Sequence, residues 1–252
     1  MKIWQSKYMV RLSKEKIFEG NSKIIYRIDE HTLIQFFKDD MRINAEKVIQ
    51  VSGKGVLNNV ISNYIFKRVS MVGINHHLIQ KINMREQLIY TLNIIPVKVC
   101  ITNIASGRYV SQFGIEDGYV FDTPIIDFMV KHGANNYPII NEDQMIKFNW
   151  VDYYELKNIK TLALKLYTFL VGMFASINIR LVECQLEFGR INNLSGDIIL
   201  LADEITPDTC KLWDLQSNCK LGYERACAEL DNAIMFYKEI IKRFNLDEYS
   251  IE

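Results

Sequence analysis

The sequence lacks a net charge, because 30 Lys and Arg residues balance 30 Asp and Glu residues over 252 positions. Proteins that bind nucleic acid or an anionic membrane surface usually carry an excess of positive charge that attracts the partner. We therefore expect no nucleic-acid partner and no membrane partner.

A long uninterrupted apolar segment is also missing. The longest candidate, residues 162–182, contains Lys165 and Arg180 and has helical spacing. It predicts a buried helix that runs into a strand rather than a membrane span. Residues 1–16 lack the apolar stretch of a secretion signal, so we expect a cytoplasmic protein.

Cysteine and histidine are few and scattered. The five cysteines contain no CxxC pair and the four histidines do not cluster with them, which disfavours a zinc site. An odd number of cysteines without a secretion signal is typical of reduced thiols in the cytosol.

The order of the expected elements indicates the fold class. Short strands are expected at residues 24–26 and 33–36, and a strand-like stretch at residues 87–102 contains Pro96 at an edge or a bend. Apolar spacing predicts helices at residues 56–72, 154–177 and 221–243. Strands come early and mix with helices later, which predicts an α+β fold in two lobes, residues 1–99 and 100–252.

One predicted hairpin carries the most chemistry. Residues 180–188 alternate between apolar and polar side chains, the pattern of a half-buried strand, with Glu183, Gln185 and Glu187 on the polar face. A turn at residues 192–196 leads into a returning strand at residues 198–202. This places Glu187 opposite about Leu201, with Asp203 as its diagonal neighbour on the same face.

Diagonal neighbours across two strands lie roughly 7–8 Å apart, a gap that one or two hydrated cations can bridge. Magnesium suits such a pair, because it takes few protein carboxylates and completes its shell with water and phosphate oxygens. Spacing alone leaves a second interpretation open, in which Glu187 and Asp203 are solvated carboxylates on an exposed sheet face.

Seven segments in one order point to a known family: FEGNSKIIY (18–26), FKDD (37–40), GKGVLNNVIS (53–62), IPVKVCITNIASG (95–107), GIEDG (114–118), LEFG (186–189) and ADEITPDTCKLWD (202–214). On these motifs the chain resembles the SAICAR synthetase (phosphoribosylaminoimidazole-succinocarboxamide synthase) family over nearly its whole length. Members of this family use ATP to join L-aspartate to the carboxylate of a phosphoribosyl-aminoimidazole carboxylic acid (CAIR), a step of de novo purine biosynthesis.

The resemblance implies a two-lobed SAICAR synthetase-like fold, with a small antiparallel-sheet N-terminal lobe, a larger α/β C-terminal lobe and ATP in the cleft. It implies ATP and Mg²⁺ as cofactors, CAIR and L-aspartate as substrates, and a homodimer formed through helices starting at Ile125 and Tyr154. Two alternatives remain: a catalytically impaired nucleotide-binding module of the same fold, and a phosphotransferase, for which no kinase-type catalytic motif is present.

The resemblance also implies roles for individual residues. Glu187 and Asp203 would hold Mg²⁺ and would act in catalysis with Lys23 and Lys54. The nucleotide would contact Gly20, Asn21, Ser22, Lys23, Ile25, Leu33, Ile89, Leu92, Ile94, Gln185, Glu187 and Asp203. The other substrate would contact Thr102, Ser106, Arg108, Lys131, Asp208 and Lys211. Core packing is the alternative for the aliphatic residues. The Gly53-Lys54-Gly55 element would offer amide groups to an anion at a helix N-terminus.

The chain departs from the family pattern at several basic positions. Asn21 and Gln185 stand where lysines are usual, and Thr102 stands where an arginine is usual. Lys211 replaces a further arginine, and Arg108 replaces a serine. Since an arginine can grip phosphate with two parallel hydrogen bonds and a lysine cannot, we expect Arg108 to compensate for Thr102.

Overall fold

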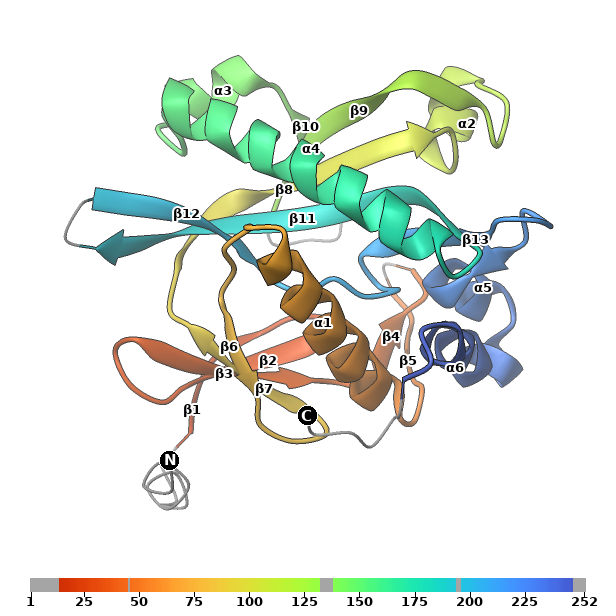
Figure 1. Cartoon of the computed structure of the whole chain (residues 1–252), viewed down its shortest axis with the longest axis horizontal. Helices are drawn as coiled ribbons and strands as arrows, with labels where there is room; N and C mark the ends of the chain where they lie inside the picture. The colour runs from red at the N-terminus through yellow and green to blue at the C-terminus, as the bar shows by residue number, and fades with distance from the viewer. Residues whose placement is uncertain (1–13, 45, 132–137, 194–195, 247–252) are drawn as a thin grey trace.

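The computed structural model describes residues 14–44, 46–131, 138–193 and 196–246, which form two antiparallel sheets with helices between and around them (Figure 1). The prediction of an α+β fold is confirmed. The first sheet has the strand order β1 (Glu15–Glu19), β2 (Lys23–Arg27), β3 (Thr32–Phe37), β7 (Glu86–Tyr90) and β6 (Leu78–Lys81). The two strands expected from residues 24–26 and 33–36 are β2 and β3.

The second sheet contains the predicted hairpin. Its order is β10 (Ile139–Ile140), β9 (Val120–Val130), β8 (Asn93–Ile104), β11 (Ile179–Asn193), β13 (Cys210–Asp214) and β14 (Lys220–Leu221), and β12 (Gly196–Ala202) also pairs with β11. A small separate ladder joins β4 (Asp40–Arg42) to β5 (Val48–Gln50). Residues 194–195 of the predicted turn lie outside the described residues.

The helices are α1 (Lys54–Met71), α2 (Arg108–Phe113), α3 (Glu142–Lys147), α4 (Tyr153–Ala175), α5 (Gly222–Ala228) and α6 (Ala233–Arg243), with a 3₁₀ turn at Leu230–Asn232. A capping box starts α4, in which the side chains of Asp152 and Glu155 each accept a hydrogen bond from the other residue's backbone N–H. The buried face of α4 packs on β11 and β8 of the second sheet (Figure 1). None of the described helices is long and apolar enough to span a membrane.

One hydrophobic core runs through both sheets. It includes Ile65 on α1, Ile89 on β7, Leu186 on β11, Leu166 on α4 and Tyr237 on α6. Figure 1 shows α1 between the two sheets, and it contacts β3 and β6 on one side and α6 on another. The proposed lobe boundary at residue 99 falls inside the continuous strand β8, and the chain passes from the first sheet to the second at residues 91–92.

Three local expectations need correction. The segment at residues 221–243 is not one helix, because Glu229 leaves the helical region with φ −128° and ψ 71°, and α5 then packs on α6. No Gly or Pro marks this break in the sequence. Ile125 lies in strand β9 rather than at a helix start, because β9 is needed to cover the free edge of β8. Pro96 lies in an internal strand, where the register between β8 and β11 shifts and its missing N–H is tolerated.

Candidate active site

Two adjoining pockets lie between the sheets. The larger, with a cavity volume of about 550 Å³, is lined mainly by polar side chains and is called the polar pocket. The smaller, of about 330 Å³, is lined mainly by aliphatic side chains and is called the apolar pocket. Both pockets are lined by Phe18, Lys23, Lys131, Glu187 and Asp203, so these five residues mark the junction.

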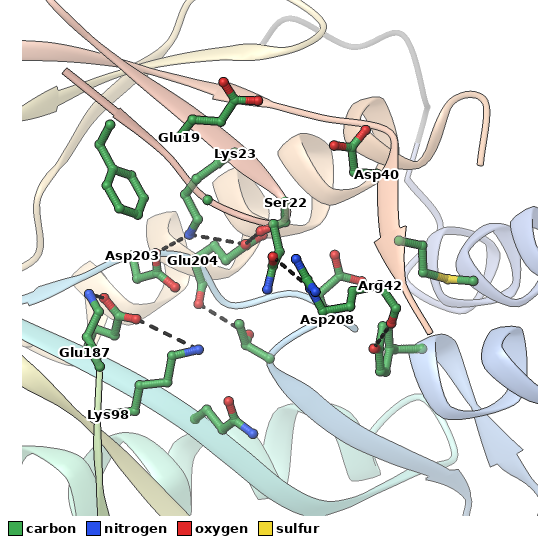
Figure 2. Close-up of a pocket in the computed structure, with 18 residues that line it drawn as sticks. Glu19, Ser22, Lys23, Asp40, Arg42, Lys98, Glu187, Asp203, Glu204 and Asp208 are labelled. Atoms are coloured by element: carbon green, nitrogen blue, oxygen red, sulfur yellow. Dashed lines mark hydrogen bonds and ion pairs between the residues drawn. The ribbon is translucent and has the colours of Figure 1, made fainter. Parts of the chain in front are cut away.

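The hairpin register brings the two predicted carboxylates to this junction by a different route from the one expected. Glu187 pairs with Ala202 rather than with Leu201, so a regular continuation of β12 would direct Asp203 to the opposite face. Asp203 instead has a φ of 66°, in the left-handed region. This turn ends the strand and places the carboxylate of Asp203 in both pockets beside Glu187 (Figure 2).

The interpretation of Glu187 and Asp203 as solvated surface groups is wrong. Only 6% of Glu187 is exposed. Burial raises the pKa of Glu187, and the negative charge of Asp203 raises it further. Burial would also raise the pKa of Asp203, but the ammonium groups of Lys23, Lys98 and Lys131 outweigh it and lower that pKa to about 2.

Three lysines compensate this buried negative charge. Lys23 forms an ion pair with Asp203, and its Nζ atom lies 3.1 Å from the carboxylate of Glu204 (Figure 2). Lys131 forms an ion pair with Glu187. The Nζ atom of Lys98 lies 4.0 Å from Glu187. Lys98 was missed from the sequence, although its place opposite Glu187 in the β8–β11 register is the signal that could have found it.

The donor set at the junction fits a magnesium ion. Within the described ranges there is no cluster of three or more His, Cys, Asp or Glu side chains that could enclose a metal alone. A buried and a half-buried carboxylate beside a pocket large enough for phosphate groups are nevertheless what Mg²⁺ needs, since it keeps several waters and takes the remaining oxygens from substrate phosphates. Glu187 and Asp203 supply those two carboxylates.

The apolar pocket collects the aliphatic residues predicted for the nucleotide. Ile25, Leu33, Ile89, Leu92 and Ile94 all line it, from β2, β3, β7 and the start of β8. Gly189 of β11 allows this close packing, since a Cβ atom there would lie 2.9 Å from the Cβ of Leu92.

Two polar residues in the apolar pocket were missed. Gln35 is 1% exposed, and its Nε2 atom has no hydrogen-bond partner among the described residues. His77 is 3% exposed and also lines the pocket. Neither belongs to a motif, so only the strand register reveals them.

The predicted glycine-containing turn lines the polar pocket with Gly20, Asn21, Ser22 and Lys23. The hydroxyl of Ser22 donates to Glu204 at 2.7 Å, which ties the turn to the segment after β12. The amide oxygen of Asn21 accepts from Arg42 at 2.9 Å. Arg42 therefore places a cation beside the position where the family usually has a lysine.

The anion site predicted at the start of α1 is present, but a carboxylate of the chain itself fills it. Asp39 accepts from the backbone N–H groups of Gly53 and Gly55, at 3.2 and 2.9 Å. Arg85 holds both oxygens of Asp39 at 2.8 Å. Lys54 is completely buried and points to Asp208 instead.

Asp208 lines the polar pocket, but internal donors surround its carboxylate. Besides Lys54, the amide of Asn58 donates to it at 2.9 Å and the hydroxyl of Tyr237 at 2.5 Å. These contacts join α1, the segment after β12 and α6.

Of the other predicted substrate residues, Lys131 lies at the junction of the two pockets, whereas Thr102, Ser106, Arg108 and Lys211 form a separate group that lines neither pocket. Thr102 and Lys211 both donate to the buried carboxylate of Glu183, at 3.3 and 2.8 Å, and Gln185 links this group to the polar pocket. Arg108 pairs with Asp127 and donates to the hydroxyl of Tyr109 at 3.0 Å. The hydroxyl of Ser106 is buried, and none of the described residues bonds it.

The sequence matches the SAICAR synthetase family over residues 16–243. A phosphoribosylaminoimidazole-succinocarboxamide synthase of Rickettsia prowazekii is 48% identical over 231 residues, which cover 91% of this chain and 98% of that protein. The counterpart from Rickettsia akari is also 48% identical over the same length.

Solved structures that resemble this chain belong to the same family. A crystal structure of phosphoribosylaminoimidazole-succinocarboxamide synthase from Ehrlichia chaffeensis superimposes with a TM-score of 0.88 at 39% identity, covering 92% of this chain and 99% of that one. A SAICAR synthetase in complex with ADP superimposes with a TM-score of 0.83 at 32% identity, covering 90% and 96%.

Proposed function

Because the chain belongs to the SAICAR synthetase family, we propose that it is an ATP-dependent ligase that forms an amide between L-aspartate and the carboxylate of CAIR, with release of ADP and phosphate. This places it in de novo purine biosynthesis. The carboxylate pair of the buried Glu187 and the half-buried Asp203, at the junction of an apolar and a polar pocket, is the structural observation that carries the proposal.

The chemistry explains why such a junction is needed. A carboxylate is a poor electrophile, because resonance spreads its charge and it has no good leaving group. Its oxygen therefore attacks the γ-phosphorus of ATP, ADP leaves, and an acyl phosphate forms. The aspartate amine then attacks the acyl carbon, loses a proton, and phosphate departs. Such catalysis depends mainly on positioning and on neutralisation of phosphate charge.

The two pockets divide the substrates between them. The adenine fits between the aliphatic side chains of the apolar pocket, and the backbone of residues 89–92 runs along its edge. The phosphates then reach the junction, where the Gly20–Lys23 turn offers backbone N–H groups and Lys23 adds a positive charge. The adjoining polar pocket then receives CAIR, whose carboxylate is activated by phosphorylation.

Glu187 and Asp203 would hold Mg²⁺, which neutralises negative charge on the phosphate oxygens when it is bound. Lys131 and Lys98 orient the carboxylate of Glu187 and limit repulsion between the two acidic groups. Thr102, Ser106, Arg108 and Lys211 would receive the phosphate of CAIR at the end of the polar pocket marked by Gln185.

A catalytically impaired binding module is not favoured. The relatives at 48% identity are named synthases, and Lys23, Glu187 and Asp203 are all present and close together. Arg42, bonded to Asn21, also keeps a positive charge beside the altered turn.

ADP release by the purified protein tests the function. With ATP and Mg²⁺ present, CAIR and L-aspartate are added singly and together. We expect sustained release only when both are present. Release without aspartate would point to a phosphotransferase, and no release under any condition would overturn the ligase in favour of the binding module.

We also expect a homodimer in the cytoplasm. Phe148, Tyr153 and Tyr154 are each more than half exposed at the start of α4 and just before it, and they offer an apolar surface for a second copy. Size-exclusion chromatography with light scattering checks the mass, and a Tyr154→Lys variant should shift it to that of a monomer.

A further inference from the structure

The end of β12 is tied directly to the first sheet. The N–H of Leu201 donates to the carbonyl of Asn75 at 3.1 Å, and the N–H of His77 donates to the carbonyl of Leu201 at 2.9 Å. Asn75 and His77 lie just before β6 of the first sheet, whereas Leu201 belongs to β12 of the second. The link therefore joins the two sheets two residues before Asp203.

Asp203 needs such support, because its backbone is in a conformation that few residues adopt. A φ of 66° in a residue other than glycine costs about 1 to 3 kcal/mol and persists where its surroundings hold it. The same turn gives the Asp203 carboxylate its direction into the pockets. Whatever holds the main chain of Asp203 also determines where that carboxylate points.

The side chain of His77 makes the holding contact. Its Nε2 atom lies 2.8 Å from the main-chain carbonyl oxygen of Asp203. A carbonyl oxygen can only accept, so Nε2 carries the proton. The ring is nearly completely buried and packs at 5.6 Å from the ring of Phe66 on α1, which leaves it little freedom to rotate.

We propose that His77 is a positioning residue, whose Nε2–H holds the left-handed turn at Asp203 and thereby directs the Asp203 carboxylate toward the Mg²⁺ and phosphate groups of a bound nucleotide. This inference rests on the proposed function for the identity of the ligand. Through His77 the affinity for Mg²⁺·ADP depends on the contact between the first sheet and β12.

Isothermal titration calorimetry of ADP at several Mg²⁺ concentrations tests the inference without catalysis. His77→Leu removes the donor, whereas His77→Gln keeps an amide N–H near the place of Nε2. His77→Asn carries a similar amide on a chain one carbon shorter. His76→Leu is the matched control, since His76 packs on the same Phe66 ring at 4.8 Å but contacts Ser70.

We expect His77→Leu to raise the Mg²⁺ concentration for half-maximal ADP binding about 10-fold to 100-fold, the usual effect of losing a group that orients a metal ligand. His77→Gln and His76→Leu should stay close to the wild type, and His77→Asn should resemble His77→Leu.

Equal Mg²⁺ dependence of folded His77→Leu and wild-type protein would overturn the inference, as would equal losses in His77→Leu and His76→Leu. If His77→Leu does not fold, the Mg²⁺ dependence of ADP binding is compared between His77→Gln and His77→Asn. Equal values for these two variants would reject a role for an N–H at the place of Nε2. If the wild type binds Mg²⁺·ADP but makes no SAICAR, only the proposed function fails. If it binds no Mg²⁺·ADP, both fail.

Discussion

We expect phosphate binding at the altered basic positions to depend on Arg108. Its guanidinium pairs with Asp127 and stacks 4.8 Å from the ring of Tyr109, close to the loop that carries Ser106. This fixes the guanidinium but leaves its five N–H donors only partly used. The arrangement is compatible with compensation for Thr102, whose hydroxyl is turned to Glu183 and to the Sγ of Cys100.

Arg108→Ser is expected to raise the KM for CAIR about 10-fold or more, because a charge-assisted hydrogen bond contributes roughly 1.5 to 3 kcal/mol. The KM for ATP should stay nearly constant, which serves as the internal control. Steady-state kinetics with each substrate varied in turn measures both. An unchanged KM for CAIR would show that Arg108 serves only to hold Asp127.

The buried His77 predicts how stability responds to acid. Its pKa is about 4 in the folded protein and 6.5 for the exposed side chain. Between pH 6.5 and pH 4 the unfolded chain therefore binds more protons than the folded one. The contribution of the neutral, buried His77 to the unfolding free energy is complete above pH 6.5 and is lost as the pH falls toward 4. The full effect is about 3 kcal/mol of unfolding free energy.

Urea unfolding at pH 7 and at pH 4.5 measures this dependence. His77→Gln should lose less stability between these two pH values than the wild type, since its amide does not titrate. A parallel decline of both proteins would show that other groups, rather than His77, control acid stability.

Sequence reasoning could find single residues where a motif or a strand period marked them. Glu187, Asp203 and Lys23 meet at the junction, and their ligand roles stay predictions. Lys98, Gln35 and His77 were missed because their importance depends on cross-strand register and burial, which no local pattern contains. The pairing of Lys54 was not foreseen for the same reason, since its partner Asp208 is 154 residues away, and its catalytic role stays a prediction.

The secondary-structure elements were easier to predict than their ends and register. Apolar residues marked helix α1 and strands β2, β3 and β11, either as a short run or at a regular spacing. The break between α5 and α6 has no glycine or proline to mark it, and the one-residue error in the β11–β12 register came from counting across a turn. Tertiary packing, rather than local propensity, decides both features.

The start of α1 offers a test of one such tertiary contact. Asp39→Ala removes the acceptor of two helix N-terminal N–H groups and the partner of Arg85. We expect a loss of about 2 kcal/mol of unfolding free energy, within the range for a helix N-cap acceptor. Chemical denaturation measures it.

Asp40→Ala is the neighbouring control, because Asp40 bonds the half-buried side chain of Lys38 and the exposed side chain of Gln50 and should cost about 1 kcal/mol or less. Equal losses in the two variants would contradict the assignment of Asp39 as the cap of α1.

Across the whole molecule, the continuous core makes the two sheets one unfolding unit. Lys54, Asp208 and Tyr237 join α1 to the segment after β12 and to α6. Lys54→Met breaks a buried ion pair and leaves the carboxylate of Asp208 without its cation. The expected loss is roughly 3 to 5 kcal/mol, in a single cooperative transition.

Differential scanning calorimetry of Lys54→Met shows whether one transition remains. Lys160→Met is the control, because Lys160 pairs with Glu142 at the surface and should contribute less than about 1 kcal/mol. Two separate transitions in the wild type would mean that the lobes unfold independently.

The contact of Tyr237 with Asp208, and the packing of α6 on α1, also constrain how the chain is made. A ribosome releases α1 long before α6, so the first sheet leaves the exit tunnel with one side of its helix uncovered. Because translation adds about 5 to 20 residues per second, this apolar surface stays exposed for many seconds. The first sheet therefore reaches its final packing only when nearly the whole chain has been synthesised, and until then the uncovered side of α1 is a surface that a chaperone can recognise.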